Sequence, residues 1–201
     1  MESITQTKFI EAMRSKKISL FSVNDLTKIF GSRPQSSLMA LILRMEKAGI
    51  IAKLIRGKYK FILGVESADS YEIANYLVSP SYISLETALS FYEIIDQFPY
   101  QITSVTTTKS KSFDIDGQTF AYAKIADPFF FDYEKNGKFL IASKPKAVFD
   151  YLYLAYLGKR SRNNINLLRF DKSILSKKTL DEYVFTHMGQ NQKFINFYKK
   201  I

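Results

Sequence analysis

The sequence contains no cysteine and a single histidine, His187. Without cysteine, disulfides and thiolate zinc sites are excluded, and one histidine is too few for imidazole metal sites or Cys/His catalysis. The apolar runs are far shorter than the ~20 residues of a membrane-spanning helix, and we expect no signal peptide at Met1. These absences predict a cytoplasmic protein that uses no metal or other cofactor and makes no membrane contact.

Glycine is also scarce, and the 8 glycines fall where helices or hairpins are expected to end, so the sequence offers no glycine-rich phosphate loop. Hydrophobic residues make up 46% of the 201 residues and aromatic residues 15%. Such a composition supports a folded core in one large domain or two small ones.

The formal charge of +10 is distributed unevenly. Residues 1–64 carry 12 basic and 4 acidic side chains, a balance of +8, whereas residues 65–158 have −5 and residues 159–201 have +7. A segment at +8 attracts polyanions, because neutralising phosphates releases condensed counterions. Nucleic acid is therefore a candidate partner. The alternative is that the lysines only keep the protein soluble.

The first part of the basic segment predicts two helices. Apolar side chains recur at helical spacing over residues 4–13 and again over residues 23–30. Ser22 precedes the second helix as its N-cap, and Asp25 at the third helical position makes an acidic variant of the capping box. Gly31 ends this helix.

A third helix is expected between Pro34, which suits a first helical turn, and Gly49. Together with the preceding helix it forms a helix-turn-helix. Its first outward-pointing residues, with an arginine one turn on, have the side chains that read base edges or contact phosphates in a major groove. These candidate DNA-binding residues are Arg33, Gln35, Ser36, Ser37 and Arg44.

Alternating patterns on both sides of Arg56-Gly57 then predict a hairpin over residues 50–63. Its basic side chains are expected to contact the DNA backbone, and they are Lys53, Arg56, Lys58 and Lys60. A helix-turn-helix followed by a basic hairpin predicts a winged-helix DNA-binding domain over residues 1–64. A winged helix that contacts only proteins is the alternative.

Residues 65–201 predict a second domain of mixed α/β type. Strands are expected at 101–107, 112–115, 118–125, 129–133 and 139–142, with hairpin turns at Asp116-Gly117 and Asn136-Gly137. The central sheet thus covers about 100–143. Helices should flank it, at 71–78, from the N-cap Ser84, from Ser143 to Gly158, and at 162–170, 176–188 and 190–198. The fold class predicted for the whole chain is α+β.

Two stretches of this domain resemble a known family. The segment from Tyr82 to Tyr92 reads YISLETALSFY, and the segment from Phe98 to Thr106 reads FPYQITSVT. Both are similar to the antitoxin domain of AbiEi, from the AbiE abortive-infection systems. The amino-terminal segment with Arg56-Gly57-Lys58-Tyr59 is similar to the DNA-binding half of the same family, so the resemblance covers essentially the whole chain.

The resemblance implies a bacterial antitoxin and transcriptional regulator of a type IV toxin-antitoxin system for phage defence. Its first domain would repress its own operon by binding inverted repeats in double-stranded DNA, and its second would counter a nucleotidyltransferase toxin, AbiEii. Direct contact with the toxin stays open. One winged helix reads one half-site, so an inverted repeat requires two copies. We expect the protein to be a monomer or a weak dimer in solution, and the two copies either form a dimer before binding or bind the DNA cooperatively.

The tail, residues 159–201, holds a cluster of basic side chains at +7. We expect a second basic surface that contacts flanking DNA, an RNA or a nucleotide product of the toxin; a solvated lysine face is the alternative. The residues of this surface are Lys159, Arg160, Arg162, Arg169, Lys172, Lys177 and Lys178.

We expect no enzyme activity. Asp114-Ile115-Asp116 resembles the magnesium-binding carboxylate pair of nucleotidyltransferases, but no Gly-Ser loop precedes it and Asp116 is expected in a turn. His187 has no recognisable catalytic partner, and we assign no catalytic residue. The remaining alternative is a winged-helix regulator that senses a small molecule and is not tied to a toxin, with residues 129–131 and nearby tyrosines lining its pocket.

Overall fold

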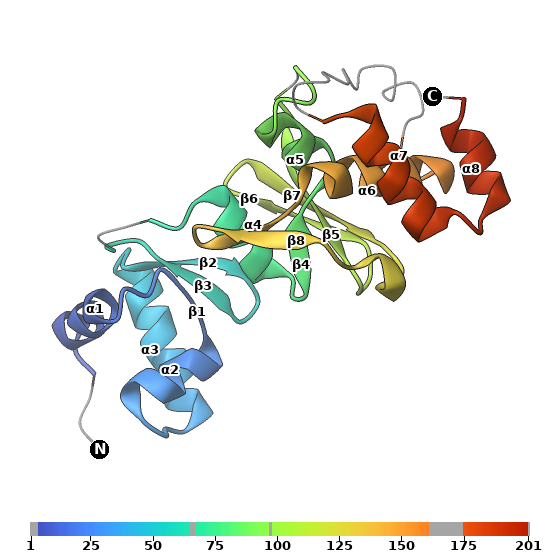
Figure 1. Ribbon diagram of the computed structural model, residues 1–201. Coiled ribbons are helices and arrows are strands. Elements are labelled where there is room, and N and C mark those ends of the chain that lie inside the picture. Colours follow the sequence, from blue (N-terminus) through green and yellow to red (C-terminus); the bar gives the residue numbers. More distant parts are fainter. Residues whose placement is uncertain (1–3, 65–66, 97, 161–174, 201) are drawn as a thin grey trace. The chain divides into compact units, whose positions relative to one another are not determined.

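The structure is a computed structural model that describes residues 4–64, 67–96, 98–160 and 175–200. It is a mixed α+β protein with two separate sheets (Figure 1). The chain divides into two compact units, Met1–Leu77 and Val78–Ile201. Each unit has its own sheet and its own buried apolar residues.

In the first unit, a three-stranded antiparallel sheet with the order β1-β3-β2 packs with helices. Its elements are α1 (Gln6–Ser15), β1 (Leu20–Ser22), α2 (Val23–Phe30), α3 (Gln35–Lys47), β2 (Ile51–Ile55), β3 (Lys58–Phe61) and α4 (Ser70–Leu77). The expected helices and hairpin of the basic segment are thus present within a few residues of their predicted bounds.

Local interactions explain where α2 begins and ends. The backbone N–H of Asp25 donates to the Ser22 hydroxyl, and the Asp25 carboxylate accepts from the Ser22 backbone N–H at 2.8 Å, so the expected capping box is confirmed. Burial alone raises the pKa of Asp25, but the hydrogen bonds from Ser22 and the charge of Lys28 bring it below its usual value. Gly31 ends the helix at φ +80°.

An aromatic cluster forms the centre of the first unit. Phe9 of α1 contacts Phe21 of β1, Phe30 of α2 and Phe61 of β3, with ring centroids 5.7 to 6.3 Å apart. Phe9, Phe21 and Phe61 are almost completely buried. Since one ring from α1 meets the sheet and α2, burial of these side chains holds the elements of the unit together.

The first unit continues past the boundary expected after Gly64, because it includes α4. The lysines of β3 connect the sheet to this region. Lys58 Nζ donates to the carbonyls of Tyr76 and Leu77, and Lys60 Nζ donates to the carbonyl of Ala68 at 3.3 Å. These hydrogen bonds join α4 and the residues before it to the hairpin.

The second unit contains a six-stranded mixed sheet with the order β6-β7-β5-β4-β9-β8, in which β5 pairs with β7, and β4 with β9, in parallel. Its strands are β4 (Ser81–Ile83), β5 (Gln101–Thr106), β6 (Lys111–Ile115), β7 (Gln118–Lys124), β8 (Tyr133–Asn136) and β9 (Phe139–Ala142). Its helices are α5 (Leu85–Phe91), α6 (Lys144–Tyr156), α7 (Lys177–Met188) and α8 (Gln192–Tyr198), with a 3-10 turn at Asp127–Phe129.

The helices form a continuous layer beside the sheet (Figure 1): α5 packs on β5, α6 on α5, and α7 and α8 on α6. Helices α5, α6 and α7 begin after Ser84, the expected N-cap, and after Ser143 and Ser176, where helices were expected to start. The Ser143 and Ser176 hydroxyls accept capping hydrogen bonds, whereas the Ser84 hydroxyl makes none and donates to Asp150. The helix expected at 162–170 lies outside the described residues. Among the residues that the structure describes, no helix has the length and apolar character needed to cross a membrane.

Three predictions for the sheet were wrong. Residues 129–131 are not a strand, because the chain makes a 3-10 turn at Pro128 and the Phe129 ring packs against α6. The second hairpin turn is Gly137-Lys138, one residue later than expected, since Asn136 pairs with Phe139. The sheet also includes β4, whose short, fully buried run shows no alternation of apolar and polar residues.

The turn at Asp116-Gly117 has positive φ at both residues, +50° and +81°, as expected for a tight hairpin. Asp116 therefore lies in the turn between β6 and β7.

We expect Ser22→Ala to lower the free energy of unfolding by about 1 kcal/mol, because the first turn of α2 loses its capping hydrogen bond. Ser32→Ala, which replaces an exposed serine after α2, serves as the control and should change it by less than about 0.5 kcal/mol. Urea unfolding of the three proteins measures both effects. Equal stability of the two variants would contradict a stabilising capping box.

Candidate nucleic-acid interface

Helix α3 has one buried side and one exposed side. Leu38, Leu41, Ile42 and Met45 point into the core of the first unit, at 0 to 5% exposure. The predicted DNA-reading residues of its first turn, Gln35, Ser36 and Ser37, are all exposed. The start of the helix therefore presents short polar side chains to solvent, where they permit close approach of a partner.

The two predicted arginines lie at either end of this surface and contact the protein itself. Arg33, in the connection between α2 and α3, is half-buried, and its Nε lies 3.4 Å from the Phe30 carbonyl. Arg44, three turns into α3, donates from its guanidinium to the Ile4 carbonyl. Both side chains thus help to position the chain around α3, and Arg44 remains exposed.

The basic residues of the hairpin fall into two groups. Lys53 on β2 and Arg56 in the turn are exposed. Lys58 and Lys60 on β3 are half-buried, and their ammonium groups bond to the backbone carbonyls of the α4 region. Lys58 Nζ also lies 4.9 Å from the Tyr76 ring centroid. Lys53 and Arg56 are thus the hairpin side chains that the structure leaves accessible to a phosphate backbone.

The predicted second basic surface is described only in part. Lys159 and the first-turn residues of α7, Lys177 and Lys178, are exposed. Arg160 instead forms an ion pair with Glu86 of α5, with Nε and Oε1 3.2 Å apart. The other members, Arg162, Arg169 and Lys172, lie outside the described residues.

Sequence reasoning missed a buried ion pair at the centre of the second unit. Lys146 and Asp150, one turn apart on α6, are both completely buried, and the Lys146 ammonium donates to Asp150 Oδ1. The other carboxylate oxygen of Asp150 accepts from the hydroxyls of Tyr82, at 3.0 Å, and Ser84, at 2.8 Å. The pair therefore connects α6 to both ends of the segment Tyr82-Ile83-Ser84.

Aromatic rings surround the buried ammonium. Lys146 Nζ lies 5.0 to 5.5 Å from the ring centroids of Tyr82, Phe131 and Phe149. Burial lowers the pKa of Lys146 and raises that of Asp150, and the attraction between the two groups opposes both shifts. The rings and hydroxyls compensate part of the cost of removing this pair from water.

This pair has a signal in the sequence, although a weak one. Lys and Asp at i and i+4 are usual on a solvated helix face, but here they interrupt a helix whose other residues are largely apolar. The resemblance to the antitoxin family rests in part on Tyr82 and Ser84, and the structure shows that both side chains bond to Asp150.

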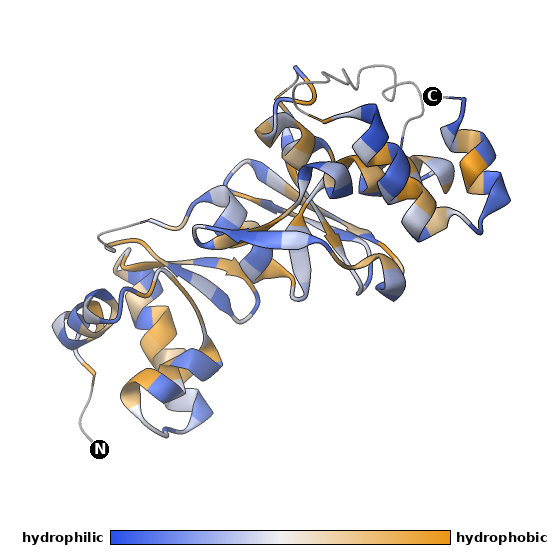
Figure 2. Cartoon of the chain, in the orientation of Figure 1, coloured by the Kyte–Doolittle hydropathy of each residue, from blue (hydrophilic) through white to orange (hydrophobic). Residues whose placement is uncertain are grey.

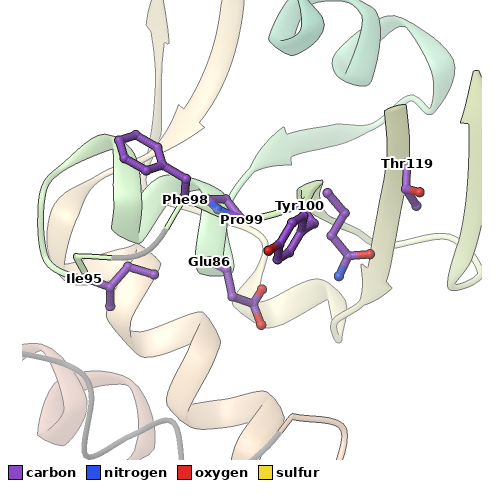
Figure 3. Close-up of a pocket in the computed structure, with 7 residues that line it drawn as sticks. Glu86, Ile95, Phe98, Pro99, Tyr100 and Thr119 are labelled. Carbon is purple, nitrogen blue, oxygen red and sulfur yellow. The ribbon is translucent and has the colours of Figure 1, made fainter. Parts of the chain in front are cut away.

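A pocket of about 540 Å³ opens elsewhere in the second unit (Figure 3). Glu86 of α5 and Thr119 of β7 line it together with the connection between α5 and β5, where Phe98 is 92% exposed and Tyr100 fully exposed. The aromatic residues expected to line a ligand pocket pack elsewhere, since Phe129 and Phe131 contact α6 and α7. Among the described residues, no group of three or more metal-ligating side chains lies close together.

We expect Lys146→Met to lower the free energy of unfolding by about 3–5 kcal/mol, because it leaves the Asp150 carboxylate buried without a counter-charge. The double variant Lys146→Met/Asp150→Asn should recover part of this loss, since the Asn oxygen still accepts from Tyr82 and Ser84 but carries no charge.

Chemical denaturation gives these values, with Lys193→Met, at an exposed lysine of α8, as the matched control. A double variant less stable than Lys146→Met alone would show that the buried charge is not what destabilises the single variant.

No protein-family model and no curated protein matches the chain. Among solved structures, the crystal structure of the RV2827C protein from Mycobacterium tuberculosis is similar, with a TM-score of 0.55 and 12% sequence identity. The similarity covers 95% of this chain and 76% of that chain. At this identity the likeness concerns the fold alone, and it supports the mixed α+β class.

Proposed function

We propose that the first unit is a winged-helix domain that binds double-stranded DNA. The observation that carries this proposal is the exposed first turn of α3, Gln35 to Ser37, on a basic segment that also exposes Lys53 and Arg56 on the following hairpin. Helix α3 enters the major groove, and the hairpin contacts phosphates as the wing.

The contacts refine the roles of the basic residues. Lys53 and Arg56 provide the phosphate contacts of the wing, whereas Lys58 and Lys60 hold the α4 region to the hairpin. Arg44 positions the residues before α1 through the Ile4 carbonyl and extends the basic rim of α3. Phosphate contacts then supply affinity, and the residues of α3 supply sequence preference.

We propose further that the protein acts in the cytoplasm as a repressor of its own toxin-antitoxin operon and as an antagonist of a nucleotidyltransferase toxin. The support is the resemblance of residues 82–92 and 98–106 to the AbiEi antitoxin domain. Two copies, either as a preformed dimer or as monomers that bind cooperatively, would read the two halves of an inverted repeat. The second unit would supply the antitoxin activity, with or without direct toxin contact.

A ligand-sensing regulator is the second candidate function, and the pocket beside Glu86 favours it. This pocket combines exposed aromatic rings with a carboxylate and other polar groups, which suits a small molecule. In this case the second unit would control DNA binding and would have no toxin partner.

We expect Arg56→Ala to weaken binding to every DNA sequence. The slope of the logarithm of the binding constant against the logarithm of the salt concentration should become shallower by about one, because one phosphate contact is lost. Gln35→Ala should instead relax the preference at one base pair, by about 1–3 kcal/mol. Titrations of the protein's own upstream DNA and a scrambled duplex, at two salt concentrations, measure both effects.

The control is Lys111→Ala, at an exposed lysine of β6, which should bind like the unchanged protein. Identical effects of Arg56→Ala and Gln35→Ala would refute the division between wing and helix. Equal, weak binding of the unchanged protein to both duplexes would refute sequence-specific recognition altogether.

If the proposed operon encodes a nucleotidyltransferase toxin, the full chain expressed from an unrelated promoter should restore growth to cells that produce this toxin. Arg56→Ala should restore growth equally well, because antagonism belongs to the second unit and repression is bypassed. Colony counts measure the rescue. Sequence-specific DNA binding without rescue would contradict the antitoxin role and favour the ligand-sensing regulator.

A further inference from the structure

The outward stripe of α3 is apolar in its middle, between Ser36 and Lys47. Residues at positions 36, 40, 43 and 47 follow one another at helical spacing on the side opposite the buried residues. At the middle of this stripe are Ala40, which is exposed, and Leu43, which is 54% exposed, with Met39 beside them at 38%. The apolar colouring of α3 in Figure 2 includes these residues together with the buried ones. We call Met39, Ala40 and Leu43 the apolar strip.

Basic residues border the apolar strip. Arg44 and Lys47 line, together with Ala40 and Leu43, a hollow of about 580 Å³ beside the start of α1. From residue 32 to residue 62 the chain carries seven basic side chains and one acidic side chain, Glu46, which is half-buried. The partner of this face should therefore combine negative charge at its edges with apolar groups at its centre.

The major groove of DNA has this combination. Its walls are phosphates, and its floor exposes one apolar group, the C5-methyl of thymine, for which alanine and larger apolar side chains are suitable contacts. The polar residues available to read bases are Gln35, whose amide pairs bidentately with adenine, and the small serines that follow it. Both features favour A·T base pairs.

We infer that the apolar strip of α3 recognises thymine methyl groups, so that the half-site read by this protein consists mainly of A·T base pairs. This inference rests on the proposed DNA binding by the first unit. Met39, Ala40 and Leu43 contact the methyl groups on the groove floor, while Lys47 and Arg44 approach the phosphates at its edge. The apolar exposure of α3 is thereby explained as a sequence-reading surface.

The test replaces thymine by deoxyuridine, which differs only by the missing methyl group, throughout the bound site of the upstream DNA. Each methyl contact that is lost should weaken binding about fourfold, because burial of one methyl group from water is lost. Two contacts in one half-site would thus give a loss of about sixteenfold. Fluorescence titrations of the normal, uracil-containing and scrambled duplexes provide the affinities.

The Leu43→Ser variant should bind normal DNA more weakly and discriminate less between thymine and uracil. Ile62→Ser removes an apolar side chain of similar exposure, 48%, that lies outside the strip, and it should keep the full discrimination. Since both side chains are exposed, both variants should fold, and their melting temperatures verify this.

Equal affinity for the normal and uracil-containing duplexes, with weaker binding to the scrambled one, would refute the recognition of thymine methyl groups. The proposed DNA binding would remain intact. No preference for the upstream DNA over the scrambled duplex would overturn both. If Leu43→Ser changes the sedimentation coefficient from dimer to monomer but not the thymine preference, the strip is a dimer interface and the inference is wrong.

Discussion

The second unit depends on the burial of one ion pair. Lys146 and Asp150 are both removed from water, and a buried charge is tolerated only when opposite charge and hydrogen bonds replace the lost hydration. The two charges compensate each other, and hydrogen bonds to Asp150 come from Tyr82 of β4 and from Ser84, the residue before α5. Because α5 begins at the residue after Ser84, the same ion pair connects α6 to the end of β4 and to the start of α5.

Neighbouring elements complete the surroundings of this pair. Ile83, between the two hydroxyl residues, pairs with strands on both sides, Ser104 of β5 and Ile141 of β9. Thr103 of β5 donates to the Ser84 carbonyl and exchanges hydrogen bonds with Thr87 of α5. A change at the ion pair would therefore disturb the middle of the sheet and the first turn of α5 together.

The first unit separates stability from surface recognition within a single helix. One side of α3 is buried with the aromatic cluster of Phe9, while the other exposes the serines of its first turn and the apolar strip. The hairpin divides its basic residues in the same way, with Lys58 and Lys60 on the α4 region and Lys53 and Arg56 in solvent. The proposed DNA contacts thus involve side chains whose replacement should leave the fold intact.

The sequence alone determined the features that depend on residues close in the chain. The capping box at Ser22 and the turn at Asp116-Gly117 need only a few neighbouring residues, so their patterns predicted them correctly. The basic character of residues 1–64 also follows directly from composition.

Contacts between distant residues decided the rest. No local pattern shows that Lys58 bonds to carbonyls 18 and 19 residues away, or that Asp150 accepts from hydroxyls 66 and 68 residues earlier. An i, i+4 Lys/Asp pair is equally compatible with solvent and with a core, because the free energy of a charge depends on which other elements surround it. Only the tertiary structure brings those elements together, and it therefore decided which charged residues are structural and which remain available to a partner.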